Sequence, residues 1–415
     1  MGSLRRNLLL GIGGAAAAFA LTRGDGPAPV AGNVGSVELT ATRATELSPP
    51  PPPPVVDPTL VLERVERRGD RYVAPTRDGR TAVLTLDVRL QEAAEKVLER
   101  ARAPRAAIVV TDRAGRVLAL AGRRTAGPRG GPDGVVDHTL ALEPWAPAAS
   151  IFKVVAAAAM VEQGARGKDR VCFHGGVRSV MESNLTDSKQ DRRCEDLSYG
   201  LAYSQNAIIA KVAHQRLEPG QLADAAARFG FGQPLPFPAP AAFGTATIPD
   251  EKGVPFGRTA AGFEGVTLSA LGGAVLAGTV AAGGQAPAPT LVAGYLDGEE
   301  LIPAPAAGAP RQVLDASVAA EVGAMMAETC RRGSAAKAFA GRERIPDVQV
   351  AGKTGTLSAR DPDYIQYSWF VGYAPADRPE LTVSVLLGNA ELWHLKAHTA
   401  ARMVLAEGLR PRPGS

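Results

Sequence analysis

The sequence predicts a mixed α/β (α+β) domain in which helices pack on an antiparallel sheet. Residues 106–111 and 116–121 have the composition of two strands joined by a tight turn, which is the pattern of a β-hairpin. Helical patterns flank this hairpin at residues 87–98 and 154–161. The order helix, hairpin, helix favours a sheet that is covered by helices.

Composition limits the classes of function. The chain has 415 residues, of which 45% are hydrophobic, so it can bury one large core or two smaller ones. Its net charge is only +4, and no lysine or arginine run is interleaved with aromatic residues. Nucleic-acid binding therefore receives no support, and the apolar content excludes a chain that is disordered throughout.

The N-terminus has the layout of a targeting segment. Arg5 and Arg6 precede an uncharged run at residues 8–21, which is shorter than the about 20 residues of a membrane span. Residues 18–20 (Ala-Phe-Ala) have the form of a signal cleavage site. We interpret residues 1–21 as a signal or anchor and expect the body to be exported. The sequence leaves open whether this segment is cleaved.

A proline-rich linker follows at residues 22–59. It contains an unbroken proline run at residues 49–54, which must adopt the extended polyproline II form. Folded structure is expected to begin near Leu60 and to continue to about residue 410 as one domain.

Ser150 and Lys153 form the first candidate constellation. They begin a helical pattern whose next residues, 154–161, are apolar and rich in alanine. Positions three apart lie on the same face of a helix, so the amine can reach the hydroxyl. Burial and a second positive charge would both lower the lysine pKa, and a neutral lysine can activate a serine nucleophile. Alone, the motif is also compatible with a surface serine and a solvated lysine.

Ser204 and Asn206 form the second constellation, in the stretch Tyr-Ser-Gln-Asn. The serine hydroxyl can pass a proton, and the asparagine amide can donate a hydrogen bond to a carbonyl. The alternative interpretation is that Ser204 is the N-cap of the helix that follows.

Lys353, Thr354, Gly355 and Thr356 form the third constellation, which we expect at the end of a strand over residues 348–351. A phosphate-binding loop is excluded because the required first glycine is Asp347. Lys353 could supply the second positive charge near Lys153 and could bind a substrate carboxylate. Gly355 would leave the strand edge open for a ligand.

The cysteines suggest one disulfide. Cys172 and Cys194 bracket a polar segment, and export would permit a bridge between them, with two reduced thiols as the alternative. Cys330 lies in a helix with an apolar face and is expected to be buried and inert.

Ser-x-x-Lys, Ser-x-Asn and Lys-Thr-Gly in this order resemble the penicillin-binding protein transpeptidase family, within the serine DD-peptidase and β-lactamase superfamily. Residues 85–91 and 369–373 look like further core segments of that family, and the resemblance spans about residues 60–409. One departure is Ala149, where the family usually has glycine. The resemblance implies an antiparallel sheet with helices on both sides and an all-helical subdomain, with the site between them.

The resemblance also implies roles for these residues. Ser150 would attack the penultimate D-alanine carbonyl of a peptidoglycan stem peptide, and Lys153 would be the general base. Ser204 would relay a proton to the leaving D-alanine, and Asn206 would bind the substrate amide.

The third constellation would bind the substrate. Lys353, with Thr354 or Thr356, would hold the terminal carboxylate, and the backbone N–H groups of Ser150 and Thr356 would form the oxyanion hole. β-Lactams would acylate Ser150, and the natural acyl-enzyme would pass to another stem peptide or to water.

Four functions thus remain: D,D-transpeptidase, DD-carboxypeptidase, serine β-lactamase and a non-catalytic penicillin-binding sensor or scaffold. The β-lactamase class with a catalytic glutamate carries it after the Ser-x-Asn motif, whereas the similar stretch here, residues 182–185, precedes Ser204. All the motif residues are present, which argues against the sensor. Transpeptidase is the main prediction.

No metal and no cofactor is expected. His394 and His398 lie four residues apart on the last predicted helix, but no third ligand is evident. Since no glycosyltransferase module fits before Leu60, the expected partner is a membrane glycosyltransferase, by family analogy. We expect the protein at the periplasmic face of a bacterial inner membrane.

Overall fold

The computed structural model of the chain describes residues 59–127, 130–177, 179–306, 308–360 and 364–411. The predicted signal segment lies outside these residues, as does the linker except for its last residue. Within the described part, no helix combines the length and the hydrophobicity that crossing a bilayer requires.

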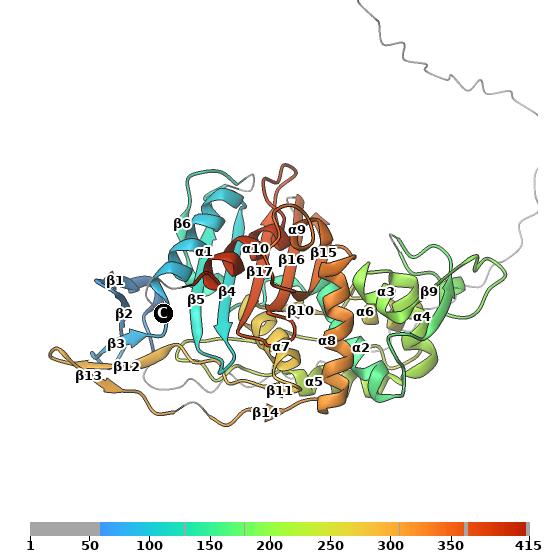
Figure 1. The fold of residues 1–415 in the computed structure, drawn as a ribbon, viewed down its shortest axis with the longest axis horizontal. Helices are drawn as coiled ribbons and strands as arrows, with labels where there is room; N and C mark the ends of the chain where they lie inside the picture. Colours follow the sequence, from blue (N-terminus) through green and yellow to red (C-terminus); the bar gives the residue numbers. More distant parts are fainter. Residues whose placement is uncertain (1–58, 128–129, 178, 307, 361–363, 412–415) are drawn as a thin grey trace, which may run out of the picture. The chain divides into compact units, whose positions relative to one another are not determined.

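A six-stranded antiparallel sheet forms the centre of the fold (Figure 1). Its strands follow the order β15-β16-β17-β4-β5-β6, so β15 is an edge strand. The predicted hairpin is confirmed as β4 and β5. The strands are β4 (Arg105–Asp112), β5 (Val117–Arg124), β6 (Val135–Val136), β15 (Ala351–Arg360), β16 (Tyr364–Ala374) and β17 (Leu381–Asn389).

Helices cover both faces of this sheet, as the sequence predicted. Alternate residues of β17 pack to opposite sides: Val383 and Val385 join the core with α1 (Val88–Ala101) and α10 (Ala397–Gly408). Leu386 joins the core on the other side, with α7 (Ala270–Ala281) and most of α8 (Ala316–Arg331). Every residue of β17 is buried, because helices cover both faces of the sheet at this strand.

The first helix shows how local sequence sets an element. The Asp87 side chain accepts a hydrogen bond from the Leu90 backbone N–H and so caps α1, as predicted. Leu90, Ala94 and Leu98 follow at helical spacing and are buried. The cap and the apolar stripe together fix where α1 begins and which face meets the sheet.

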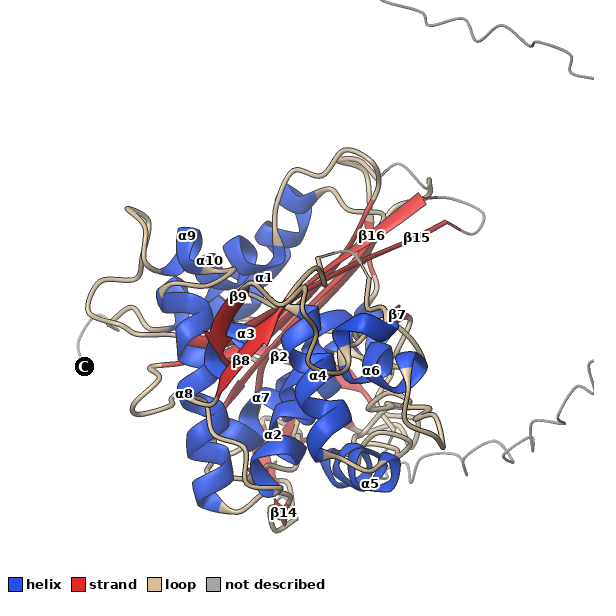
Figure 2. Cartoon of the chain, turned by 90° about the vertical axis from the view of Figure 1, so that its right-hand side faces the viewer, coloured by secondary structure: helices blue, strands red, loops and turns tan. Residues whose placement is uncertain are grey.

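A group of helices lies beside the sheet and forms the predicted helical subdomain (Figure 2). Residues 234–257 are rich in proline and glycine, which predicts a loop, but this prediction is wrong at its end because a helix begins at Val254, with Pro255 in its first turn. The group comprises α2 (Lys153–Glu162), preceded by the 3₁₀-helix η3 (Ala149–Phe152), then α3 (Leu197–Ala202), α4 (Asn206–Arg216), α5 (Pro219–Phe229) and α6 (Val254–Ala260).

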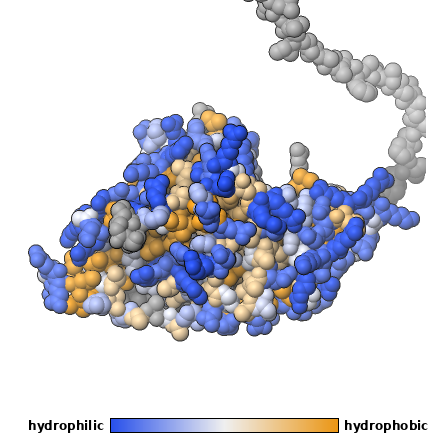
Figure 3. Space-filling view, viewed as in Figure 1, coloured by the Kyte–Doolittle hydropathy of each residue, from blue (hydrophilic) through white to orange (hydrophobic). Residues whose placement is uncertain are grey.

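A second, five-stranded antiparallel sheet was not predicted; of its strands, the sequence pattern indicates only β3, as a strand over residues 81–86. Its order is β1-β2-β3-β12-β13, and its edge strand β13 exposes Leu301 and Ile302. Hydrophobic residues, coloured orange, gather on this part of the surface in Figure 3. The strands are β1 (Glu66–Arg68), β2 (Arg71–Pro75), β3 (Thr81–Leu84), β12 (Val292–Asp297) and β13 (Glu300–Pro303).

Short elements complete the fold. They are η1 (Leu62–Arg64), η2 (His138–Ala141), η4 (Glu182–Asn184), α9 (Ala336–Phe339), and the strand pairs β7 (Ala146–Pro147) with β10 (Thr267–Leu268), β8 (Arg170–Phe173) with β9 (Arg193–Asp196), and β11 (Gln285–Ala286) with β14 (Arg311–Gln312). A disulfide joins Cys172 to Cys194, which stand opposite each other in the β8–β9 pair.

The cap of α1 gives a test of this account of the fold. We expect Asp87→Ala to lower the free energy of unfolding by about 1 kcal/mol, because a backbone N–H loses its acceptor. Asp87→Asn retains an acceptor and should stay within a few tenths of a kcal/mol of the wild type. Denaturant unfolding of both variants checks this. If Asp87→Asn lost as much free energy of unfolding as Asp87→Ala, the hydrogen-bond acceptor at this position would contribute nothing to stability.

Candidate active site

Ser150 and Lys153 meet at the junction of η3 and α2. The Lys153 Nζ lies 2.7 Å from Ser150 Oγ, within hydrogen-bond distance. Lys153 is fully buried, whereas Ser150 is partly exposed. The apolar body of α2 buries the amine, while the hydroxyl remains within reach of a ligand. The interpretation as a surface serine and a solvated lysine is therefore wrong.

Two further acceptors surround the Lys153 amine. Its Nζ lies 2.8 Å from Asn206 Oδ1 and 2.7 Å from the Ala261 backbone oxygen. Neither oxygen can donate a hydrogen bond. A neutral amine has two N–H groups and one lone pair, so these two acceptors take both N–H groups. The lone pair is then directed at the Ser150 hydroxyl, which is the geometry that a general base needs.

The surroundings of Lys153 favour its neutral form. Burial lowers its pKa well below the ordinary value, and the nearby positive charge of Lys353 lowers it further. Among the described residues, no carboxylate forms an ion pair with either lysine to offset this. Both causes are those that the sequence analysis anticipated.

Lys353 reaches the site from the edge strand β15. We expected the motif at the end of a strand over residues 348–351, but this was wrong because β15 begins at Ala351 and the motif lies within it. Lys353 Nζ donates to Ser204 Oγ at 3.0 Å and to the Thr354 backbone oxygen at 2.8 Å. Burial lowers the Lys353 pKa to about 7.

Ser204 occupies a strained turn between α3 and α4. Its φ is +57°, a left-handed value that non-glycine residues rarely adopt. Its N–H bonds the Leu201 oxygen, and the Gln205 N–H bonds the Gly200 oxygen, which is the Schellman pattern that ends a helix. The N-cap of α4 is Gln205, so the alternative interpretation of Ser204 as the N-cap of that helix is wrong.

The remaining motif residues differ in their surroundings. Thr354 Oγ1 lies 2.6 Å from Ser334 Oγ, and Thr356 is exposed on the same edge strand. A Cβ on Gly355 would lie 3.1 Å from the Trp369 Cβ and 3.3 Å from Ile151 Cγ1. Gly355 therefore lets η3 pack closely on β15, which differs from the open edge that the sequence analysis expected.

Ala149, which departs from the family pattern, carries backbone strain. Its φ is +48°, whereas glycine adopts such values without cost. A Cβ on the facing Gly262 would lie 2.0 Å from the Ala149 oxygen. The chain around Ala261 and Gly262 therefore passes directly against the residue before Ser150.

Two backbone carbonyls that accept hydrogen bonds from site side chains were not predicted from the sequence. The Ala261 oxygen accepts from Lys153, and the Gly176 oxygen accepts from Asn206 Nδ2 at 2.8 Å. Every residue carries a carbonyl, so residue type gives no signal for Ala261. The adjacent glycines 175 and 176 were the only local signal for the second group.

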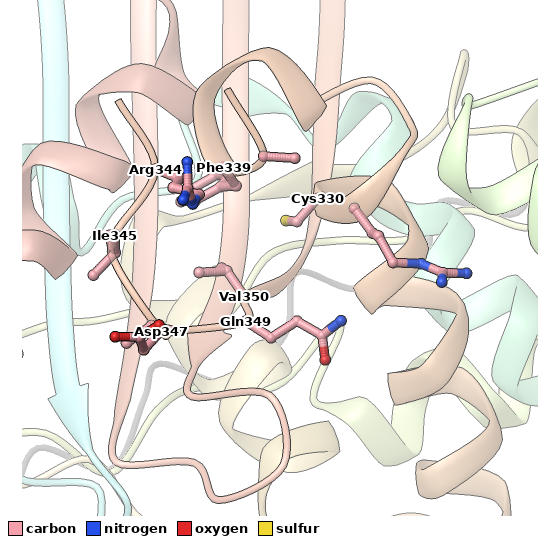
Figure 4. Close-up of a pocket in the computed structure, with 10 residues that line it drawn as sticks. Cys330, Phe339, Arg344, Ile345, Asp347, Gln349 and Val350 are labelled. Atoms are coloured by element: carbon pink, nitrogen blue, oxygen red, sulfur yellow. The ribbon is translucent and has the colours of Figure 1, made fainter. Parts of the chain in front are cut away.

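Cys330 and the two histidines stand apart from this site. Cys330 is a free, buried thiol beside a cavity of about 420 Å³, and burial raises its pKa (Figure 4). The residues lining this cavity include none of the three motifs. Within the described part of the chain, no cluster of three or more metal-ligating side chains occurs, and burial lowers the His398 pKa to about 4.

Comparison with known proteins agrees with this geometry. The family model described as penicillin binding protein transpeptidase domain matches residues 106–406. The chain therefore belongs to the penicillin-binding protein transpeptidase family. It is 28% identical over 253 residues to the peptidoglycan D,D-transpeptidase PbpA of Mycobacterium tuberculosis, covering 59% of this chain and 50% of PbpA. It is 25% identical over 337 residues to penicillin-binding protein PbpB of the same organism, covering 75% of this chain and 48% of PbpB.

Solved structures of penicillin-binding proteins share the fold. The ceftriaxone acyl-enzyme complex of M. tuberculosis penicillin-binding protein A superposes with a TM-score of 0.65 at 22% identity, over 80% of each chain. A D,D-transpeptidase domain from Eggerthella lenta gives 0.63 at 23% identity, over 80% of this chain and 83% of that chain. The present chain spans about half the length of the curated relatives that it matches.

The strain at Ala149 yields a prediction. We expect Ala149→Gly to stabilise the protein by up to about 1 kcal/mol, because it removes a left-handed alanine. Ala157→Gly, in the middle of the buried helix α2, should instead destabilise by about 1 kcal/mol or more. Thermal unfolding of the two variants measures the contrast, and destabilisation of similar size in both would show that Ala149 is not strained.

The two lysines predict a bell-shaped pH profile for acylation by a β-lactam. The rate should fall toward low pH as Lys153 becomes protonated. It should also fall as pH rises through about 7, the Lys353 pKa in the free protein, because Lys353 then loses the positive charge that could bind the ligand carboxylate. Lys353→Arg keeps its charge at high pH and should flatten the alkaline limb of kcat/KM. An unchanged alkaline limb in that variant would contradict the assignment.

Proposed function

We propose that this protein is a peptidoglycan D,D-transpeptidase that works through a serine acyl-enzyme and binds penicillin covalently. The observation that carries the proposal is the position of Lys153, whose Nζ meets Ser150 Oγ, Asn206 Oδ1 and the Ala261 oxygen together. A buried amine whose remaining lone pair faces a serine hydroxyl can activate that hydroxyl as a nucleophile.

In the proposed reaction, Lys153 takes the Ser150 proton as Oγ bonds to the carbonyl carbon of the penultimate D-alanine. The tetrahedral intermediate collapses, the peptide bond breaks and the terminal D-alanine leaves as an amine. Ser204, which contacts Lys353, relays a proton to this amine and regains one from Lys153, so the proton taken from Ser150 ends on the leaving D-alanine and both residues return to their starting states. Asn206, whose Oδ1 contacts the Lys153 amine, binds the substrate amide.

The edge strand β15 serves the bound peptide in this proposal. Lys353, with Thr354 or Thr356, holds the terminal carboxylate, and a bound carboxylate would raise the Lys353 pKa and keep this lysine charged. The backbone N–H groups of Ser150 and Thr356 form the oxyanion hole, since donors aimed at a developing negative charge lower the barrier most. Because β15 is an edge strand, a ligand can lie along it.

The second half of the reaction separates the alternatives. Transfer of the acyl group to an amine makes a crosslink, transfer to water is carboxypeptidase activity, and rapid hydrolysis of a β-lactam adduct is β-lactamase activity. Glu182 is exposed in η4, and no carboxylate of the described residues forms a hydrogen bond with Ser150 or Lys153. A glutamate-activated water therefore has no support, which favours a long-lived β-lactam adduct.

The setting of the reaction follows from the same proposal. A chain that crosslinks peptidoglycan acts outside the cytoplasm, at the periplasmic face of the inner membrane if residues 1–21 anchor it. Its substrate would be glycan strands polymerised by a membrane glycosyltransferase, which is the proposed partner.

The test is labelling with a fluorescent penicillin, followed by intact mass over several hours. We expect one stable adduct on Ser150 that is absent in Ser150→Ala. Ser358→Ala, a serine farther along β15, is the matched control and should label as the wild type does. No adduct at any concentration would contradict an acylating site and leave the sensor or scaffold.

A second measurement identifies the outcome of deacylation. The protein is given a stem peptide ending in D-Ala-D-Ala, with and without an amine acceptor. A new product that contains the acceptor supports the transpeptidase, whereas release of D-alanine alone supports the carboxypeptidase. Rapid loss of the penicillin adduct with release of hydrolysed penicillin supports the β-lactamase.

A further inference from the structure

We infer that the segment closed by the Cys172–Cys194 disulfide is a positioning element for Lys153. It would act through the Gly176 carbonyl, which fixes the orientation of the Asn206 amide and thereby the direction of the Lys153 lone pair. The inference rests on the proposed function, in which Lys153 is the base. It assigns to residues outside the three motifs the role of orienting Asn206 and, through it, Lys153.

The Asn206 amide has two different ends, and its two neighbours distinguish them. Nδ2 donates to the Gly176 oxygen at 2.8 Å and lies 3.4 Å from the Val177 oxygen. Oδ1 accepts from Lys153 Nζ at 2.8 Å. If the amide turned over, Oδ1 would face carbonyl oxygens and Nδ2 would face the amine, leaving buried groups without partners. The Gly176 oxygen therefore holds Oδ1 on the side of Lys153.

Two glycines allow the segment to approach Asn206 this closely. Gly175 and Gly176 have φ values of +58° and +72°. A Cβ on Gly176 would lie 2.5 Å from the Ala207 Cβ and 2.5 Å from the Ala207 backbone nitrogen. Any larger residue would have to move the chain away from α4, and the carbonyl that orients Asn206 would move with it.

The segment is tied to the helix that Asn206 begins. Lys211, on the same helix α4 and almost fully buried, donates to the Cys172 oxygen at 2.8 Å and to Asp191 Oδ2 at 2.6 Å. The other oxygen of Asp191 lies 2.6 Å from His174 Nδ1, and the far side of that ring contacts Ser183 Oγ at 3.1 Å. These contacts, together with the disulfide, fix both ends of the segment relative to Asn206.

The buried charges of this network are balanced within it. Burial opposes ionisation of Asp191, but hydrogen bonds from His174 and Lys211 outweigh it and lower the Asp191 pKa. A buried ion pair with satisfied hydrogen bonds holds its partners in one geometry, and removal of one partner leaves an uncompensated charge. The network therefore acts as a rigid support for residues 174–177.

The test compares two glycine substitutions. Gly176→Ala should lower the rate of acylation by a fluorescent penicillin about 100-fold, because a small displacement of a reacting group is enough for such a loss. Gly69→Ala is the matched control: its φ is +64°, nothing lies within 4 Å of its added Cβ, and it sits in the β1–β2 turn. It should acylate at the wild-type rate.

The acid limb of the pH–rate profile of Gly176→Ala distinguishes a specific loss of Asn206 orientation from a general loosening of the site. Loss of the Asn206 acceptor removes support for charged Lys153, so the limb should move to lower pH while the maximum falls. A site that merely loosens and admits water would restore the Lys153 pKa and move the limb to higher pH. The second result would overturn the inference.

A second variant covers the case in which Gly176→Ala does not fold. Cys172→Ser combined with Cys194→Ser removes the covalent closure and should also slow acylation, whereas Cys330→Ser should not. Wild-type rates in a folded Gly176→Ala protein, or in the double serine variant if the former is unfolded, would overturn the inference alone. Absence of acylation in the wild type would instead contradict the proposed function.

Discussion

The site depends on one buried amine with three fixed neighbours. Lys153 is enclosed by the apolar helix α2, and its Nζ is shared by Ser150, Asn206 and the Ala261 carbonyl. Burying an amine without a carboxylate is unfavourable for the charged form, so the protein favours the neutral amine. The two oxygen acceptors then leave only one direction for the lone pair. The fold thus directs the Lys153 lone pair at one hydroxyl, which is what the proposed general base requires.

The neighbours of this amine come from separate parts of the chain, and strained or crowded backbone brings them together. Ser204 takes a left-handed conformation at the end of α3, which places its hydroxyl on Lys353. Gly355 lets η3 approach β15, and Gly176 lets a loop approach Asn206. Strain of this kind persists only where the surrounding structure enforces it. Here the enforcing elements are the edge of the central sheet and the helical subdomain.

The sequence predicted the side chains that meet in the candidate site but not the backbone groups that hold them. Ser150 and Lys153 are three residues apart on consecutive helical turns, so local spacing was sufficient to pair them. The contact between Lys353 and Ser204 joins positions far apart in the chain, so local spacing gives no signal for it. The resemblance to a family implied only that both residues belong to one site. The Ala261 and Gly176 carbonyls could not be predicted because backbone groups have no residue signature. The α6 helix was missed because the proline in its first turn resembles a loop signal.

The measurement that tests this account most directly is the protonation state of Lys153. Lysine labelled with ¹³C at Cε reports its own charge by NMR, and Lys153→Met assigns the signal. The account predicts a neutral amine at pH 7 in the wild type, and a rise in the Lys153 pKa when Lys353 is replaced by methionine. An ammonium signal for Lys153 that persists above pH 9 would contradict it, because a charged lysine cannot take the proton of Ser150.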